Sequence, residues 1–298
     1  MLDEGLALNT LGLALRHMRR FEEAIDAHTK AAELFRRAGA RQREGEALGN
    51  LGLALRQVRR FEEAIDAHRQ DLAICREYHD RHGEADALMN LGNVLRQVRQ
   101  LDQAIELEQQ AAVLYGETGD RHHQGEAVNN LGIALTEADR LGEAMDAHTE
   151  AVRLFRESGD SNGESRALVN LGRALIKVSR FEEAIDPEQR AVQLFRETGD
   201  RHHLAGALTN LGGALGGTDR VTEAIDAYTE AVHLFQETGD KHSEGVALSD
   251  LGIALRQAGR FEEAIRAHGQ AFQIFSELSD QEMAAAALGN LFATAGGG

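Results

Sequence analysis

Length, composition and charge restrict the class of protein. The chain has 298 residues, a net charge of −17 and only 5% aromatic residues. A charge of this sign argues against nucleic acid or anionic lipid as the main partner, and no apolar run approaches the length of a membrane span. The single cysteine, Cys75, excludes an intrachain disulfide and indicates a reducing compartment, so we expect a cytoplasmic protein.

A short motif recurs every forty residues along the chain. It consists of Leu-Gly, a variable residue, a small apolar residue and Leu, and no insertion breaks its register. Its glycines are Gly12, Gly52, Gly92, Gly132, Gly172, Gly212 and Gly252. A fixed period of this size predicts a solenoid, in which each unit buries its apolar face only against its neighbours.

Each unit is predicted to form two helices, as the second unit illustrates. Leu48, Leu51 and Leu55 recur at three- and four-residue spacing and predict one amphipathic helix. Two arginines then interrupt the apolar stripe, and Phe61 begins a second helix. The sequence therefore predicts one all-α solenoid over residues 1–298, with a final capping helix. The hairpin units are 1–40, 41–80, 81–120, 121–160, 161–200, 201–240 and 241–280, and the capping helix is 281–295.

Two kinds of glycine are expected to have different roles. The Gly-Asp pairs that close units predict a left-handed glycine after one helix and an aspartate N-cap before the next. These pairs are Gly119-Asp120, Gly159-Asp160, Gly199-Asp200 and Gly239-Asp240. The motif glycines lie in mid-helix, where glycine costs about 1 kcal/mol relative to alanine. We interpret them as sites of close helix approach, with small partners at Ala24, Ala64, Ala104, Ala144, Ala184, Ala224 and Ala264.

The motif resembles the tetratricopeptide repeat, as Leu51-Gly52, Leu55 and Ala64 show in the second unit. The period is longer than the usual ~34 residues, the aromatic at the family's first position is missing, and a Gly-Asp linker replaces the closing proline. This longer variety is similar to the repeats of Pins-type scaffolds, kinesin light chains and bacterial regulators. The resemblance implies a right-handed superhelix whose concave face is lined by the first helix of each unit.

An asparagine before most Leu-Gly motifs is the strongest candidate for ligand binding. At 100° per residue, Asn50 lies on the same helix face as Leu53, away from the Leu48 and Leu55 stripe, and is predicted to face the groove. The ladder comprises Asn50, Asn90, Asn130, Asn170, Asn210, Asp250 and Asn290. A side-chain amide can donate to and accept from one peptide unit, so a row of them can hold an extended backbone.

The resemblance also implies this role, because several tetratricopeptide proteins grip the ligand main chain through an asparagine here. The alternative is that the asparagines bond to neighbouring helices and set the superhelical pitch. Other groove positions would then give specificity. Asn93 and Arg173 interrupt an otherwise apolar row. Four arginines one turn later, Arg16, Arg56, Arg96 and Arg256, are predicted to engage carboxylates, and three of them lie in the first three units. Solvated or glutamate-paired arginines are the alternative to that clamp.

The histidines are predicted to be structural. His28, His68, His148 and His268 share a repeat position that Tyr228 occupies in the sixth unit, which indicates packing between helices. His122 and His123 are adjacent, and adjacent residues on a helix do not share a face, so we expect no two-ligand metal site there. The chain contains no HExxH motif, cysteine pair or Gly-x-Ser-x-Gly element. We therefore expect no catalytic residue, metal or cofactor.

These expectations favour a non-enzymatic module that binds an extended peptide or partner segment in its groove. The alternative is a sensor or regulatory fragment of a larger bacterial signalling or transcription-regulatory protein. An enzyme-linked role, as in repeat-containing phosphatases, is the third hypothesis and has no nucleophile or phosphate loop to support it. The exposed ends of a solenoid leave end-to-end self-association open.

Overall fold

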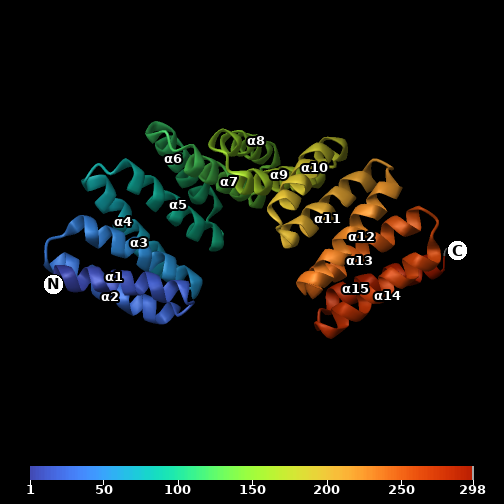
Figure 1. Ribbon diagram of the computed structural model, residues 1–298, viewed down its shortest axis with the longest axis horizontal. Coiled ribbons are helices and arrows are strands. Elements are labelled where there is room, and N and C mark those ends of the chain that lie inside the picture. The colour runs from blue at the N-terminus through green and yellow to red at the C-terminus, as the bar shows by residue number, and fades with distance from the viewer. Residues whose placement is uncertain (297–298) are drawn as a thin grey trace. The chain divides into compact units, whose positions relative to one another are not determined.

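The computed structural model describes residues 1–296, which fold into helices joined by short turns (Figure 1). The chain divides into two compact units, Met1–Ser158 and Gly159–Gly298. Unit 1 contains α1 (Leu2–His17), α2 (Phe21–Arg37), α3 (Arg41–Gln57), α4 (Phe61–Glu77), α5 (Arg81–Gln97), α6 (Leu101–Thr118), α7 (Arg121–Glu137) and α8 (Leu141–Ser158). Unit 2 contains α9 (Ser161–Lys177), α10 (Phe181–Thr198), α11 (Arg201–Gly217), α12 (Val221–Thr238), α13 (Lys241–Gln257), α14 (Phe261–Glu277) and α15 (Gln281–Ala295).

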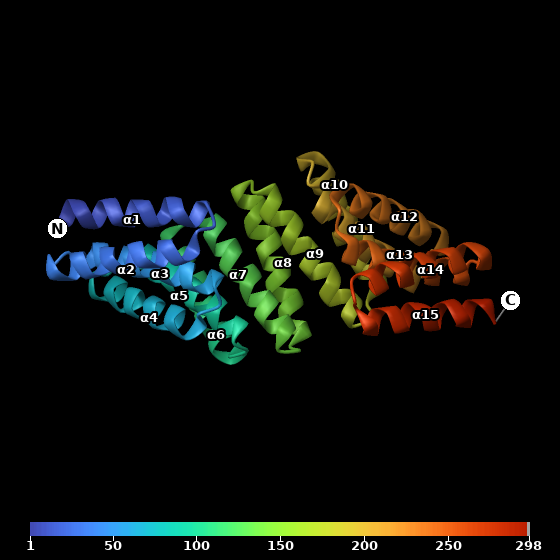
Figure 2. The ribbon, with the colours of Figure 1, turned by 90° about the horizontal axis from the view of Figure 1, so that it is seen from below.

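This arrangement confirms the predicted all-α solenoid of seven hairpins and a capping helix. The helix ends follow the local signals in the sequence. Gly119, for example, adopts the left-handed conformation after α6 with a φ of 78°, and the Asp120 side chain accepts a hydrogen bond from the His123 backbone at the start of α7. In Figure 2, α15 lies beside α14 at the end of unit 2, as expected for a cap.

The turn inside each hairpin contains a left-handed residue that the sequence pattern did not predict. One residue of this turn has a positive φ in every repeat, and it is glycine only at Gly259. The other positions are Arg19, Arg59, Arg99, Asp139, Ser179 and Asp219. A left-handed non-glycine residue costs about 1 kcal/mol, so helix packing on both sides of the turn must offset that cost.

Contacts between hairpins define an inner and an outer side within each unit. In unit 1, α1 contacts α3, α3 contacts α5 and α5 contacts α7, whereas no second helix approaches the next second helix within 8 Å between Cα atoms of described residues. In unit 2, the helices from α9 to α15 alternate in the same way. The first helices therefore lie on the inner side of each unit's curvature.

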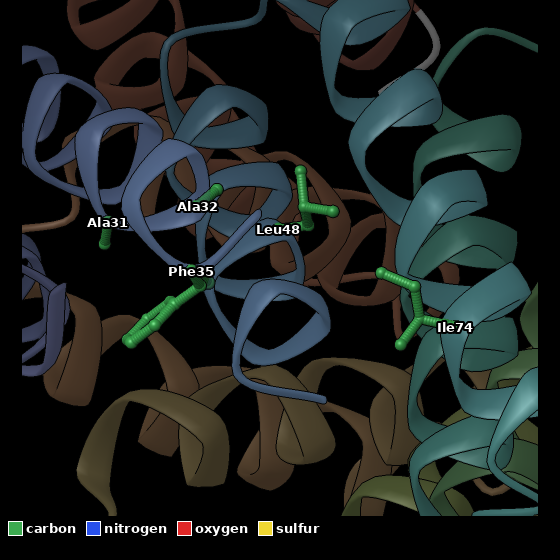
Figure 3. Packing of buried hydrophobic residues seen from close by; sticks show 6 residues of the cluster. Ala31, Ala32, Phe35, Leu48 and Ile74 are labelled. Atoms are coloured by element: carbon green, nitrogen blue, oxygen red, sulfur yellow. The ribbon is translucent and has the colours of Figure 1, made fainter. Parts of the chain in front are cut away.

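The core consists of layers of small and branched side chains between consecutive hairpins. One layer joins Ala32 and Phe35 of α2 to Leu48 of α3 and Ile74 of α4 (Figure 3). Phe35 is completely buried. Because each layer involves only adjacent hairpins, burial accumulates repeat by repeat, as in other solenoids.

Candidate functional site

The predicted asparagine ladder lies on the first helices, at positions that are neither sealed nor fully exposed. All seven of its side chains are half-buried: Asn50, Asn90, Asn130, Asn170, Asn210, Asp250 and Asn290. Burial raises the pKa of Asp250 to about 6. Asp250 therefore differs from the six asparagines, because its carboxyl group can gain or lose a proton.

The members of the ladder differ in their partners. The side chains of Asn90 and Asn130 form no hydrogen bond among the described residues. The Asn50 amide donates a long hydrogen bond of 3.4 Å to the Asn9 side chain. Asn210 lies beside the buried Glu188 and partly offsets the effect of burial on the pKa of that carboxyl, although neither Glu188 oxygen has a well-oriented donor. Within unit 1, Asn90 and Asn130 are therefore the rungs whose amides have no hydrogen-bond partner among the described residues.

A second asparagine position, one residue earlier, holds the hairpins together and was missed from the sequence. The ring of His28 donates from Nδ1 to Asn9 Oδ1 at 2.8 Å, and His148 donates in the same way to Asn129 at 3.0 Å. Only some repeats carry Asn here, so no ladder was visible. These two bonds join the first and second helices of one hairpin, α1 to α2 and α7 to α8.

The partners of the motif glycines correct the expectation from sequence. The close approach is real, but it is made by a side chain sixteen residues later and not by the small alanines. An ideal Cβ on Gly52 would lie 2.5 Å from two atoms of the His68 ring, and one on Gly212 would lie 2.8 Å from the Tyr228 ring. The alanines face the same interface and are fully buried, but they are not what the glycines accommodate.

The repeated histidines are structural, as predicted. His28, His68, His148 and His268 are at most 1% exposed. Burial, assisted by nearby Arg16 and Arg56 respectively, lowers the pKa values of His28 and His68 to about 4, so both are neutral at physiological pH. In the third and fifth repeats a glutamate takes this position. Burial raises the pKa values of Glu108 and Glu188 well above the ordinary range.

The predicted arginines form a row along the inner side of unit 1. Arg16, Arg56 and Arg96 are each half-buried. Burial, together with the charges of its two neighbours in the row, lowers the pKa of Arg56. Arg96 is paired with Glu137 at 2.5 Å, whereas Arg16 and Arg56 have no acidic partner within 4.0 Å among the described residues. Two of the three arginines are therefore available to an anionic group.

The remaining predicted groove positions vary in accessibility. Leu53 and Asn93 are half-buried, and Arg173 is exposed on α9 in unit 2. Arg173 lies close enough to Glu188 for its charge to oppose the effect of burial on the pKa of that carboxyl. Arg173 therefore acts on the buried Glu188 of unit 2 and is not a member of the arginine row of unit 1.

Metal-ligating side chains come together at two overlapping places in unit 1. The ligand atoms of His82, Asp120 and His123 lie within 4.8 Å of one another, as do those of His122, His123 and Glu126. The rings of the adjacent His122 and His123 have centroids 5.0 Å apart. The expectation that adjacent histidines point apart was therefore wrong, because the side chains are long enough to bend toward each other. Asp120 already caps α7 and accepts a hydrogen bond from His123 Nδ1 at 2.7 Å, so a metal would compete with an existing bond.

Sequence and structural comparisons identify the family. A profile of the tetratricopeptide repeat matches residues 3–77, 45–117, 124–197 and 203–277, while no curated protein matches the sequence. Among the described residues, no helix combines the length and apolarity needed to cross a membrane.

Three solved structures show the same fold at low sequence identity. A Rap protein complexed with competence and sporulation factor is 17% identical with a TM-score of 0.61, over 93% of this chain and 76% of that one. YrrB, described as a tetratricopeptide repeat protein with an unusual peptide-binding site, is 20% identical with a TM-score of 0.52, over 72% and 96%. A signal transduction ATPase with a tetratricopeptide repeat sensor, from Pyrococcus horikoshii, is 14% identical with a TM-score of 0.82; the match covers 96% of this chain and 44% of the ATPase. The repeat profile covers most of the residues, and the chain belongs to the tetratricopeptide repeat family.

Proposed function

We propose that the chain is a non-catalytic interaction module that binds an extended peptide, or an extended segment of a partner protein, along the first helices of unit 1. The observation that carries the proposal is the unused bonding capacity of this face: the amides of Asn90 and Asn130 and the guanidinium groups of Arg16 and Arg56. Amides at repeat spacing can satisfy the peptide backbone irrespective of its sequence. The arginines would engage a carboxylate of the ligand, either a side chain or a C-terminus.

The fold relatives support this reading. The Rap relative was solved with a peptide factor, and the YrrB relative is described by its peptide-binding site. The tetratricopeptide repeat family is generally a non-catalytic interaction scaffold. Self-association through the ends of the solenoid remains compatible with this proposal, because it would leave the groove free.

The asparagine rungs can be tested with a double variant, Asn90→Ala/Asn130→Ala. Each hydrogen bond contributes about 0.5–1.5 kcal/mol, so losing two bidentate rungs should weaken binding to a peptide array by at least about tenfold. The melting temperature should stay unchanged, because neither amide has a partner within the described residues. Asn210→Ala is the matched control. It removes an amide from the same repeat position in unit 2, where Asn210 lies beside Glu188, and it should leave peptide binding intact. Retained binding in the double variant, with lowered stability, would instead assign the rungs a structural role.

The arginine row predicts a salt-dependent component of binding. Peptides that carry a carboxylate should bind Arg56→Gln several-fold more weakly than wild type, and added salt should weaken wild-type binding because exposed charges are screened within about 10 Å at 0.1 M salt. Fluorescence anisotropy at several salt concentrations measures both effects. Arg256→Gln, at the equivalent position of the seventh repeat, is the control. Affinity that is independent of salt would remove the arginines from the site.

A second candidate function is that of a sensor module within a larger signalling protein. Its support is the Pyrococcus horikoshii ATPase, in which a tetratricopeptide repeat sensor accompanies further domains and this chain matches less than half of the length. In such a protein the groove would hold a segment of the same polypeptide until a ligand displaced it. The reading frame and its neighbouring genes distinguish this function from an independent module.

A further inference from the structure

The second repeat departs from the other six at three positions, two in α4 and one directly after it. Asp71 replaces an alanine that every other hairpin carries, Cys75 replaces a phenylalanine or tyrosine, and Tyr78 replaces a smaller or aliphatic residue. All three side chains line one cavity of about 650 Å³ between α3, α4 and the start of α5. The cavity also reaches two rungs of the ladder, Asn50 and Asn90.

The cavity exists because an aromatic ring is missing. In the first and fourth hairpins, the rings of Phe35 and Phe155 lie against Gly5 and Gly125, about 3 Å from where a Cβ would be. Gly45 is the equivalent glycine of the second hairpin, and no ring faces it. Its nearest neighbours are instead the Asp71 carboxylate and Ile74. The space that a phenyl group fills elsewhere is open here and is lined by a carboxylate.

The groups around the cavity suit a cation. Asp71 has no basic side chain within 4.0 Å among the described residues, and its only close partner is the Cys75 thiol, with Sγ 3.6 Å from Oδ1. Glu46 from α3, Asp80 before α5 and Asp86 on α5 line the same space. The two arginines at its rim are already paired: Arg41 with Glu44 at 2.7 Å and Arg43 with Glu46 at 2.9 Å.

The carboxylate is short of a counter-charge. Burial, reinforced by the charges of Asp86, Asp80 and Glu46 and opposed by the thiol hydrogen bond, raises the pKa of Asp71 to about 7. A cation placed beside it would restore the charged form. Tyr78 is 42% exposed and presents an aromatic ring at the same cavity, which is a second group that attracts cations.

We propose that this cavity binds the cationic side chain, the ammonium of lysine or the guanidinium of arginine, of a peptide held in the groove of unit 1. The inference rests on the proposed function, because the peptide backbone is held by the ladder and the cavity selects one side chain. Asn50 and Asn90 border the cavity, so a side chain branching from a backbone on these rungs enters it directly. Together with the arginine row, the cavity would select peptides that carry charges of both signs.

The test uses an array of short random peptides in which each lysine or arginine has an uncharged counterpart, glutamine or citrulline. Wild type should prefer the charged member of a pair by about tenfold, since hydrogen bonds to charged groups are about twice as strong as neutral ones. Asp71→Asn keeps the shape of the cavity and should abolish the preference. Asp66→Asn, the same change on the exposed face of α4, should preserve it.

A second variant protects the test against loss of folding. Asp71→Ala/Cys75→Phe installs the residues of the other repeats, so it should melt at a higher temperature than wild type while losing the preference for basic peptides. Peptides that bind wild type without any preference for a charged side chain would overturn the inference and leave the proposed function standing. A preference that survives both variants would also overturn it.

Agmatine, which carries a guanidinium group and no peptide backbone, separates the cavity from the ladder. Agmatine binding that is lost in Asp71→Asn, with no peptide bound by wild type, would identify a small-molecule site and contradict a peptide side chain as the occupant. Weakened peptide binding in Asn130→Ala, a rung that does not line the cavity, with agmatine binding retained, would support the assignment. Failure of the ladder and failure of the cavity therefore give different results.

Discussion

Replacing Gly52 by alanine should destabilise the protein by about 2 kcal/mol, although alanine is the better helix former. The new Cβ would lie 2.5 Å from the Cε1 and Nε2 atoms of His68, and that ring is completely buried and cannot move into solvent. Overpacking of this kind costs about 1–3 kcal/mol, which exceeds the gain of up to about 1 kcal/mol in helix propensity. Urea denaturation followed by circular dichroism measures the difference.

Gly206 on α11 supplies the matched control, because nothing lies within 4 Å of its ideal Cβ. Gly206→Ala should stabilise the protein by about 0.5–1 kcal/mol. In a His68→Ala background, Gly52→Ala should no longer destabilise, and the double-mutant cycle should give a coupling of about 2 kcal/mol. Equal effects of the two glycine substitutions would show that the glycine-histidine contact does not constrain the hairpin.

The second large effect concerns the buried glutamates and pH. Glu108 is 2% exposed and its Oε2 atom has no hydrogen-bond partner. Burial raises its pKa well above 4.5, with Arg96 opposing. A glutamate with a raised pKa in the folded state contributes its full stability below the unfolded pKa and loses it as the pH rises through the folded pKa. The free energy of unfolding should therefore fall above pH 4.5, by about 1.4 kcal/mol per pH unit until the folded pKa is reached.

Glu108→Gln removes this titration while keeping the shape of the side chain. The variant should be more stable than wild type at pH 8, and the difference should shrink steadily as the pH approaches 4.5. Glu106→Gln makes the same charge change at an exposed position of α6 and should show no such trend. Thermal denaturation of the three proteins across this pH range is the measurement. A pH-independent difference between Glu108→Gln and wild type would mean that the pKa of the carboxyl is the same in the folded and unfolded states, which would contradict the prediction.

The two buried glutamates occupy the position at which other repeats bury a neutral histidine. Burial lowers the pKa values of His28 and His68 to about 4, so those histidines oppose folding only when the pH falls from about 6.5 toward 4. Histidine and glutamate at the same repeat position therefore give opposite pH dependences. Above about pH 6.5 the glutamates alone lower stability, and below about pH 4.5 the histidines alone do, so the contribution of these groups should be most favourable between the two values.

Local signals in the sequence were sufficient for the helices and their ends. The period of forty residues, the apolar spacing around Leu48 and Leu55, and the Gly119-Asp120 junction each depend on residues close in the chain, and each is confirmed. Helical geometry predicted that Asn90 and Asn130 face the groove, and in the structure both side chains are half-buried. Helical geometry does not decide whether these amides bind a ligand, because that depends on the groups that contact them.

Tertiary packing decided which side chains contact each other, and the sequence alone did not predict these contacts. Gly52 accommodates the ring of His68 and not Ala64, because the pitch of the hairpin brings residues sixteen positions apart into register. The repeat pattern alone gave no reason to single out Asp71, Cys75 and Tyr78, because only the packing of α4 between α3 and α5 turns the missing phenyl ring into a cavity. The sequence by itself determined the repeat and its helices through short-range spacing. The partners of the glycines, the free rungs and the acidic cavity depend on contacts between helices, which no local pattern encodes.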